Sequence, residues 1–124
     1  MAKAVGFGGV FLRARDPKAL SKWYETNLGI EHRVSDEALT LDGPESTGTT
    51  VFAHFPADTH YFGEGPQQAM VNFRVDDLDG LLTQLDAAGV RIEPKREDFP
   101  YGRFAWIWDP EDNRVELWEP NAES

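Results

Sequence analysis

The 124-residue sequence predicts an α+β fold, in which two βαβββ modules form a curled mixed sheet within a single domain, 1–124. Two observations predict it. One is a duplication, which pairs Asp16, Leu20 and Gly29 with Asp77, Leu81 and Gly89. The other is that short segments of alternating apolar and polar residues, bounded by turn residues, flank two runs with helical spacing. The repeats are expected at about residues 5–55 and 69–119, joined by a linker at residues 56–68.

The first module is expected to begin with a strand at Val5–Ala14 and to continue into a helix. Asp16 stands at the N-cap position, and Pro17 follows at the first helical position, where its fixed φ is favourable. Apolar residues then recur at helical spacing as far as Leu28, and Gly29 is expected to end the helix. The remaining elements are strands at residues 30–34, 37–41 and 49–55 and a turn at residues 43–48.

The second module repeats this order after a connection that contains two prolines and two glycines. A strand at residues 69–75 leads to a helix that is capped by Asp77 and ended by Gly89. The remaining elements are strands at residues 90–93, 103–108 and 114–118 and a turn at residues 109–113.

The composition argues against several classes of function. The formal net charge of −10, from 22 acidic and 12 basic residues, argues against a nucleic-acid partner. The absence of cysteine excludes a disulfide framework and a thiol nucleophile. Because there is neither a long apolar run nor the pattern of a signal peptide, we expect a cytoplasmic protein that does not bind a membrane.

Strand alternation predicts which side chains pack beneath a helix and which face the other way. The apolar sets expected beneath the helices are Val10 and Leu12; Val51, Ala53 and Phe55; Val71, Phe73 and Val75; Ala105 and Ile107; and Val115 and Leu117. The opposite, open face collects aromatic side chains with a few polar ones. The ligand-binding residues expected there are Phe11, Arg13, Phe52, Met70, Asn72, Arg74, Phe104, Trp106, Trp108 and Trp118.

An open face of this composition is too apolar to remain in water, so the sheet is expected to curl into a cup or to pack against another subunit. Aromatic cavities with a few convergent polar groups are typical of small-molecule sites. Arg13 and Arg74 occupy equivalent places in the two modules and suit a carboxylate, phosphate or sulfonate. Two alternatives stay open: the aromatic residues as ordinary core or interface, and the arginines as partners of an acid such as Glu116.

Two passages of the sequence resemble the vicinal oxygen chelate superfamily, which includes glyoxalase I, bleomycin resistance proteins and extradiol dioxygenases. The first runs from Phe11–Pro17 through Trp23 and Tyr24 to Asn27–Ile30, and the second is Asp109–Leu117, with the pattern D-P-x-x-N-x-x-E-L. The resemblance implies paired βαβββ modules and a homodimer. In metal-dependent members it also implies a divalent ion held by four side chains, one from each of four strands.

Carrying those four positions over places them on Gly9, on Phe52 or Ala53, on Met70 and on Glu116. Glu116 alone has the side chain that the resemblance leads one to expect. Glycine has no side chain, and phenyl and thioether groups are poor ligands for hard or borderline divalent ions. We therefore expect no metal and no other cofactor, with a divalent metal at an incomplete site as the alternative.

The function that this pattern favours is metal-independent binding of a small organic ligand that is anionic or aromatic. One alternative is a glyoxalase-like lyase or isomerase, or a dioxygenase, with an atypical or incomplete metal site; the other is a structural dimerisation module. For an enzyme, the catalytic candidates are His54 and Glu116, because an imidazole can exchange protons near neutral pH. His32 is expected to face solvent, and His60 to cover the cleft or to lie at a loop tip.

Overall fold

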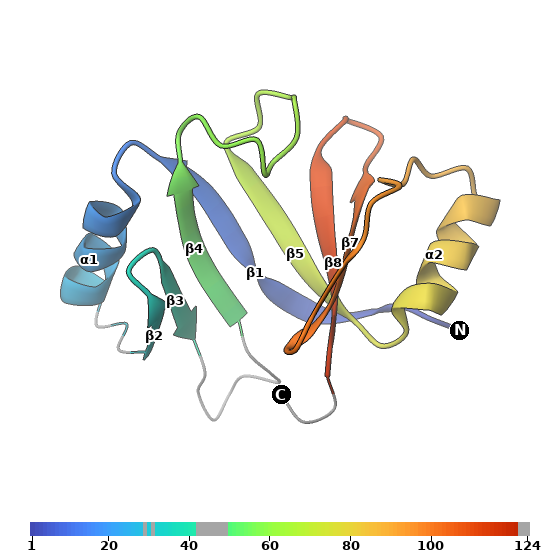
Figure 1. Cartoon of the computed structure of the whole chain (residues 1–124), viewed down its shortest axis with the longest axis horizontal. Coiled ribbons are helices and arrows are strands. Elements are labelled where there is room, and N and C mark those ends of the chain that lie inside the picture. The colour runs from blue at the N-terminus through green and yellow to red at the C-terminus, as the bar shows by residue number, and fades with distance from the viewer. Residues whose placement is uncertain (29, 31, 42–49, 122–124) are drawn as a thin grey trace. The chain divides into compact units, whose positions relative to one another are not determined.

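The computed structural model describes residues 1–28, 30, 32–41 and 50–121, with the backbone alone described at residues 32–34 and 41. The chain forms two compact units, one of residues 8–71 and the other of residues 1–7 and the chain from Asn72 onward. The element order is β1 α1 β2 β3 β4 β5 α2 β6 β7 β8, and Figure 1 labels all of these elements except β6. This confirms the predicted α+β class and the repeated βαβββ order.

The unit of residues 8–71 contains the first module, with one helix and strands in the order β2-β3-β4-β1. Its elements are β1 (Ala4–Ala14), α1 (Pro17–Leu28), β2 (His32–Ser35), β3 (Ala38–Leu41) and β4 (Thr50–Pro56). The pair β1–β4 is parallel and the other pairs are antiparallel, so the pairing is mixed. α1 lies against β3 and β4. The expected helix stop at Gly29 and the turn at 43–48 lie outside the described residues.

The other unit contains the second module, with strands in the order β5-β8-β7-β6. Its elements are β5 (Ala69–Val75), α2 (Leu78–Ala87), β6 (Glu97–Phe99), β7 (Gly102–Trp108) and β8 (Arg114–Pro120). The strand predicted at residues 90–93 is wrong: Ile92 makes only an isolated bridge to Ile107, and the strand forms later, at β6. Pro94 has no N–H group with which to extend that pairing.

Both helices begin at the predicted aspartates. The N–H of Ala19 donates to Asp16 Oδ1 at 3.1 Å, and the N–H of Gly80 donates to Asp77 Oδ1 at 3.1 Å. Each carboxylate therefore satisfies a helix N–H that has no partner within its own helix. Neither helix of the described residues is long and apolar enough to cross a membrane.

The apolar core beneath α2 confirms the predicted alternation in β5, β7 and β8. Its fully packed members are Val75, Leu78, Ala105 and Leu117, surrounded by Phe73, Leu81, Leu82, Leu85, Ile107 and Val115. The helix ends at Gly89 as predicted, since Gly89 has a φ of 80° and the N–H of Val90 donates to the carbonyl of Leu85 at 3.0 Å. Removal of these side chains from water is the main stabilising contribution in this unit.

The assignment of faces in β4 is wrong. Val51, Ala53 and Phe55 were expected beneath α1, yet the ring of Phe52 lies 4.7 Å from the ring of Tyr24, and His54 lies beside Ser21. Phe55 packs on the opposite face against Phe11, at 5.6 Å between ring centroids. Each alternating set of β4 contains one phenylalanine, Phe52 in one and Phe55 in the other, so hydrophobicity alone did not identify the face beneath α1. The contact between Ser21 of α1 and His54 accounts for the face of β4 that lies beneath the helix.

The N-terminal segment belongs with the second module, which the sequence did not reveal. The N–H of Lys3 donates to Asp76 Oδ1 at 2.9 Å, and the N–H of Asp76 donates to the carbonyl of Lys3 at 3.2 Å. The side-chain amide of Gln84 bonds both the N–H and the carbonyl of Ala2, at 2.9 and 3.0 Å. The main chain of Ala2 and Lys3 is thus bonded to Asp76, which follows β5, and to the side chain of Gln84 in α2.

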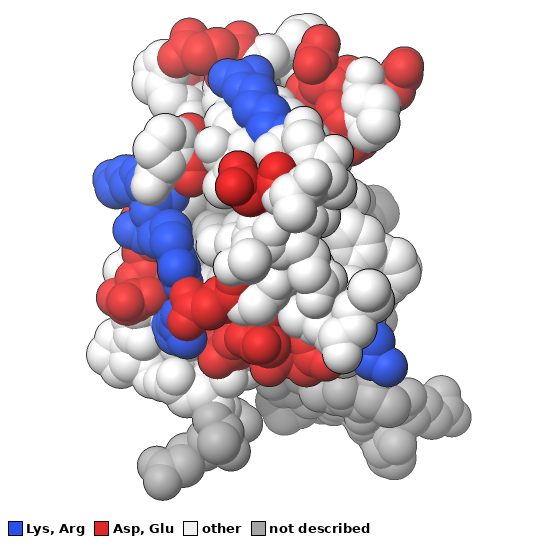
Figure 2. Space-filling view, turned by 90° about the vertical axis from the view of Figure 1, so that its right-hand side faces the viewer, with Lys and Arg blue, Asp and Glu red and all other residues white. Residues whose placement is uncertain are grey.

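Acidic side chains predominate on the α2 side of the molecule, with basic ones between them (Figure 2). The carboxylate of Asp79 in α2 lies 2.8 Å from a guanidinium nitrogen of Arg96 (Oδ1 to NH1) and 2.7 Å from one of Arg103 (Oδ2 to NH2). Hydrogen bonds, first from Arg103 and then from Arg96, lower the pKa of this carboxyl group. These groups are exposed and screened by water, so we assign them a solubility role rather than a large contribution to stability.

Candidate functional site

The sheet face of β7 and β8 that points away from α2 carries most of the predicted aromatic residues. Cross-strand pairing sets Phe104 opposite Trp118, Trp106 opposite Glu116 and Trp108 opposite Arg114, and directly opposed residues share a face. We use the name aromatic face for Asn72, Phe104, Trp106, Trp108, Arg114, Glu116 and Trp118. The rings of Phe104 and Trp118 stack with centroids 5.9 Å apart and planes inclined by 4°.

Glu116 lies at the centre of this face and is 0% exposed. Its Oε2 accepts a hydrogen bond from Asn72 Nδ2 at 2.6 Å, and its Oε1 accepts one from Trp106 Nε1 at 3.1 Å. A buried carboxylate requires such donors, because burial removes its hydration. The structure thus brings together three predicted site residues from β5, β7 and β8, with the carboxylate held in one orientation.

Asn72 and Trp118 of the aromatic face each have a buried polar atom without a hydrogen-bond partner among the described residues. These atoms are Asn72 Oδ1, an acceptor, and Trp118 Nε1, a donor. Buried polar atoms are nearly always hydrogen-bonded in folded proteins. A bound molecule that both donates and accepts hydrogen bonds is one way to satisfy this pair.

Cationic side chains lie over the tryptophans of the aromatic face. The guanidinium carbon of Arg114 is 5.1 Å from the ring centroid of Trp106 and 5.6 Å from that of Trp108. The guanidinium carbon of Arg91 is 3.8 Å from the centroid of Trp108. Cation–π attraction fixes the positions of these arginines, and they set positive charge next to an aromatic surface in an otherwise acidic protein. Neither Arg91 nor Arg114 was among the site residues predicted from the sequence.

Arg13 and Arg74 were predicted to contact a ligand. In the structure both donate hydrogen bonds to main-chain carbonyls. Arg13 donates from Nε to the carbonyl of Gln67 at 2.9 Å, and from its NH1 atom to those of Thr59 at 2.7 Å and Ala57 at 3.0 Å. Arg74 donates from its NH1 atom to the carbonyl of Phe7 at 2.5 Å. Each side chain holds a neighbouring segment in place, and a ligand contact by either stays a prediction.

Three other predicted residues, Phe11, Phe52 and Met70, belong to the unit of residues 8–71. Phe11 is buried and packs against Phe55 and against Tyr61, whose ring centroid is 6.4 Å away. Met70, near the start of β5, is fully buried. Phe52 lies beneath α1, so the placement of Phe52 on the open face is wrong.

His54 also lies beneath α1, so its predicted place on the open face is wrong. The imidazole is 2% exposed, its Nδ1 is 2.7 Å from Ser21 Oγ, and its ring stacks on Tyr24 at 5.6 Å between centroids. Its Nε2 has no hydrogen-bond partner among the described residues. Burial lowers the pKa of His54 from its ordinary value of 6.5, which favours the neutral imidazole. Of the other two histidines, His60 is exposed, and only the backbone of His32 is described by the structure.

We expect His54 to make the stability of the protein depend on pH. The unfolded chain takes up a proton near pH 6.5, whereas the folded chain resists it, so the free energy of unfolding should fall as the pH decreases through that value. The slope should approach about 1.4 kcal/mol per pH unit for a single proton. Urea unfolding of the wild type and of His54→Gln between pH 7.5 and 5.5 tests this. Equal slopes in the two proteins would contradict it.

The positions expected for a family-type metal provide one oxygen ligand. Gly9 has a φ of 153°, and a Cβ there would collide with the carbonyl oxygen of Val51. Glu116 has both carboxylate oxygens hydrogen-bonded. Across the described residues, no group of three or more histidine, aspartate or glutamate side chains is placed to hold a metal ion. The residues at these four positions therefore do not fit a four-ligand divalent metal site.

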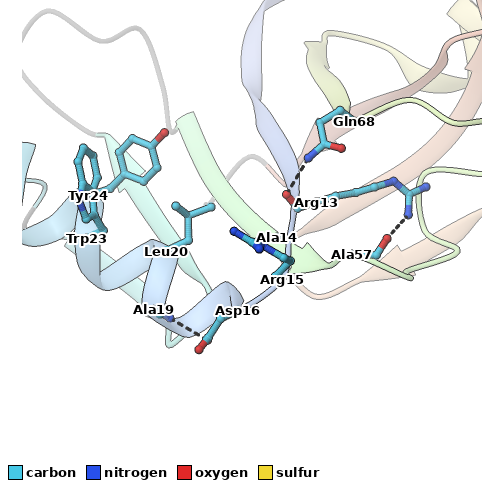
Figure 3. Close-up of a pocket in the computed structure, with 10 residues that line it drawn as sticks. All are labelled: Arg13, Ala14, Arg15, Asp16, Ala19, Leu20, Trp23, Tyr24, Ala57 and Gln68. Atoms are coloured by element: carbon cyan, nitrogen blue, oxygen red, sulfur yellow. Dashed lines mark hydrogen bonds between the residues drawn. The ribbon is translucent and has the colours of Figure 1, made fainter.

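A pocket of about 930 Å³ that was not predicted from the sequence lies in the unit of residues 8–71 (Figure 3). Its lining residues are Arg13, Ala14, Arg15, Asp16, Ala19, Leu20, Trp23, Tyr24, Ala57 and Gln68. Leu20, Trp23 and Tyr24 recur at helical spacing in the sequence, and Trp23 is 53% exposed in the structure.

Comparison with solved structures shows the same fold. Methylmalonyl-CoA epimerase from Mycobacterium tuberculosis matches with a TM-score of 0.68 and 22% identity, over 97% of this chain and 91% of that chain. A variant of the Streptomyces coelicolor epimerase in complex with 2-nitronate-propionyl-CoA gives 0.73 and 16%, over 97% and 100%. A glyoxalase/bleomycin resistance protein/dioxygenase superfamily member from Vibrio splendidus 12B01 gives 0.59 and 16%, over 96% and 99%.

No curated protein sequence matches this chain. The sequence profile of the Glyoxalase/Bleomycin resistance protein/Dioxygenase superfamily matches residues 6–117, which is most of the chain. The repeated βαβββ order and the fold of the solved structures agree with this match. The chain therefore belongs to the glyoxalase/bleomycin resistance protein/dioxygenase superfamily.

Proposed function

We propose that this protein binds a small aromatic organic anion at the aromatic face, without a resident metal ion. The observation that carries the proposal is the buried Glu116 carboxylate, oriented by Asn72 and Trp106 on a face of stacked aromatic rings. Aromatic surfaces with a few fixed polar groups are the usual construction of small-molecule sites. The buried atoms without partners, Asn72 Oδ1 and Trp118 Nε1, supply an acceptor and a donor for such a ligand.

The preference for an anion rests on Arg91 and Arg114, the arginines that lie over the tryptophans of the aromatic face. Arg114 and Arg91 lie over the rings of Trp106 and Trp108, and guanidinium groups bind carboxylates and sulfonates well. The carboxylate of Glu116 opposes this preference, but two hydrogen bonds already engage it. A ligand with a hydroxyl group as well as an acidic group matches the acceptor at Asn72 Oδ1. We therefore infer an aromatic hydroxy acid or a compound of similar chemistry.

The proposed metal independence rests on the ligand positions. One carboxylate with both oxygens hydrogen-bonded, together with Gly9 and Met70, is too poor a set for a divalent ion. Binding should be the same before and after dialysis against a chelator. A stoichiometric metal that restores binding after chelation would instead support the glyoxalase-like or dioxygenase-like enzyme.

The binding experiment uses the indole N–H resonances of the full-length ¹⁵N-labelled protein, which has four tryptophans. Trp106→Phe assigns the resonance of the indole that donates to Glu116. We expect 6-hydroxy-2-naphthoate to shift this resonance saturably and to bind about tenfold more tightly than 2-naphthylmethylammonium, a cation of similar ring size. An unchanged Trp106 resonance with both probes would overturn the proposal. Conversion of the probe, or of methylmalonyl-CoA, would favour the enzyme.

A homodimer in the cytoplasm is part of the same proposal and is supported by the family resemblance and the composition. Size-exclusion chromatography with light scattering measures the oligomeric state. If Trp106→Ala changes the oligomeric state while no probe shifts the indole resonances, the aromatic face serves as a dimerisation surface instead of a ligand site.

A further inference from the structure

We propose a second binding site, for a planar organic anion, in the pocket at the junction of β1 and α1. The pocket lies wholly within residues 8–71, and it does not include any residue of the aromatic face. Its volume of about 930 Å³ is within the range of small-molecule pockets. The site combines an aromatic platform, Trp23 with Tyr24, and the guanidinium of Arg15.

The two arginines that line this pocket have different roles. Figure 3 shows Arg13 extending toward Ala57, where it donates a hydrogen bond, while Arg15 extends the other way, toward Leu20 of α1. In the described part of the chain, Arg15 makes no hydrogen bond or ion pair. Arg13 is therefore a fixed part of the wall, and Arg15 is the group that is available to a ligand.

The charged residues next to Arg15 and on α1 have other partners. Asp16 accepts a hydrogen bond from the N–H of Ala19 as the cap of α1. The Nζ atom of Lys18 lies 3.6 Å from a carboxylate oxygen of Asp36, and that of Lys22 lies 3.3 Å from one of Glu25. Among the described residues Arg15 forms no ion pair with any of them, in a protein with a formal net charge of −10. A guanidinium beside aromatic rings is suited to an anion with a flat apolar body.

The aromatic platform has one fixed ring and one accessible ring. Tyr24 stacks on His54 with planes inclined by 8° and meets Phe52 edge-on, so the packing beneath α1 holds it. Trp23 meets Tyr24 edge-on, with centroids 5.1 Å apart, and is 53% exposed. An exposed tryptophan next to a hollow gives a planar ligand a surface for stacking at little conformational cost.

The test follows the Trp23 indole N–H, assigned with Trp23→Phe, during titration of the full-length protein with 2-naphthoate. We expect 2-naphthoate to shift this resonance saturably. The affinity derived from the titration should fall about tenfold in Arg15→Gln, and it should also fall as the sodium chloride concentration is raised. Lys22→Gln, which removes a cation already paired on the same helix, should bind as the wild type does. The cation 2-naphthylmethylammonium should bind much more weakly than 2-naphthoate.

Three outcomes would overturn this inference: no shift of the Trp23 resonance at saturating 2-naphthoate, equal affinity in Arg15→Gln and wild type, or equal binding of the anion and the cation. The fold of each variant is checked by the dispersion of its amide resonances, and the salt dependence of the wild type tests the charge without any substitution. The Trp106 resonance reports on the aromatic face in the same spectra, so failure at one site is distinguishable from failure at the other.

Discussion

Glu116→Leu is expected to lower the free energy of unfolding by about 3 kcal/mol and to abolish ligand binding at the aromatic face. The substitution leaves Trp106 Nε1 and Asn72 Nδ2 buried without the acceptor that each now has. A buried donor without a partner is destabilising by roughly 1–3 kcal/mol, and two such donors make the effect large. Urea unfolding measures the change in stability, and the naphthoate titration of the Trp106 indole measures the change in binding.

Two further variants distinguish the loss of the two Glu116 hydrogen bonds from the loss of a negative charge. Glu111→Leu removes an exposed carboxylate on the turn before β8 and should change stability by less than about 0.5 kcal/mol. Glu116→Gln keeps one acceptor for Trp106 but turns an amide donor toward Asn72, so its stability should lie between those of Glu116→Leu and wild type. If Glu116→Leu were as stable as the wild type, the two hydrogen bonds would not contribute to stability.

Gly9→His is expected to destabilise the protein by roughly 2–3 kcal/mol and to create no metal site. The substitution would add a histidine at a position where metal-dependent relatives are expected to carry a ligand. Two features of the backbone oppose it. The φ of 153° at Gly9 is one that residues with a side chain rarely adopt, and a Cβ there collides with the carbonyl oxygen of Val51 on the paired strand β4.

The matched control is Gly65→His, in the linker. A Cβ at Gly65 meets no atom within 4 Å, so this variant should have wild-type stability. Thermal or urea unfolding compares the two histidine variants, and titration with zinc tests whether either gains a metal-dependent increase in stability. Stabilisation of Gly9→His by stoichiometric zinc would show that the backbone of β1 can adapt, and would refute the expectation.

The sequence predicted the fold through features that act locally. The caps at Asp16 and Asp77 and the stop at Gly89 depend on residues close in the chain, and the structure confirms them. The alternation beneath α2 was also predictable, because polar and apolar residues there separate clearly between the two faces. The carboxylate of Glu116 was selected for its place in the family pattern, and its two hydrogen bonds were not foreseeable.

The errors arose where hydrophobicity carried no decisive information. In β4, Phe52 and Phe55 are on opposite faces and are equally apolar, and the Ser21–His54 contact that distinguishes the faces joins residues 33 positions apart. Residues 1–7 attach to the second module through the main chain of Ala2 and Lys3, whose partners are the main chain and side chain of Asp76 and the side chain of Gln84. Interactions of this kind leave no pattern in a single sequence.

The guanidinium of Arg13 donates hydrogen bonds to main-chain oxygens of the linker, those of Ala57, Thr59 and Gln67. Every amino acid has a carbonyl, so these three bonds do not depend on which side chains those positions carry. The linker can therefore change in sequence at these positions as long as it keeps its path, Arg13, the Phe62 ring 5.0 Å from the guanidinium, and Gln68, whose side-chain amide donates to the Arg13 carbonyl. Arg74 likewise donates to a main-chain oxygen, that of Phe7 in β1, so this bond too does not depend on the side chain of the residue that accepts it.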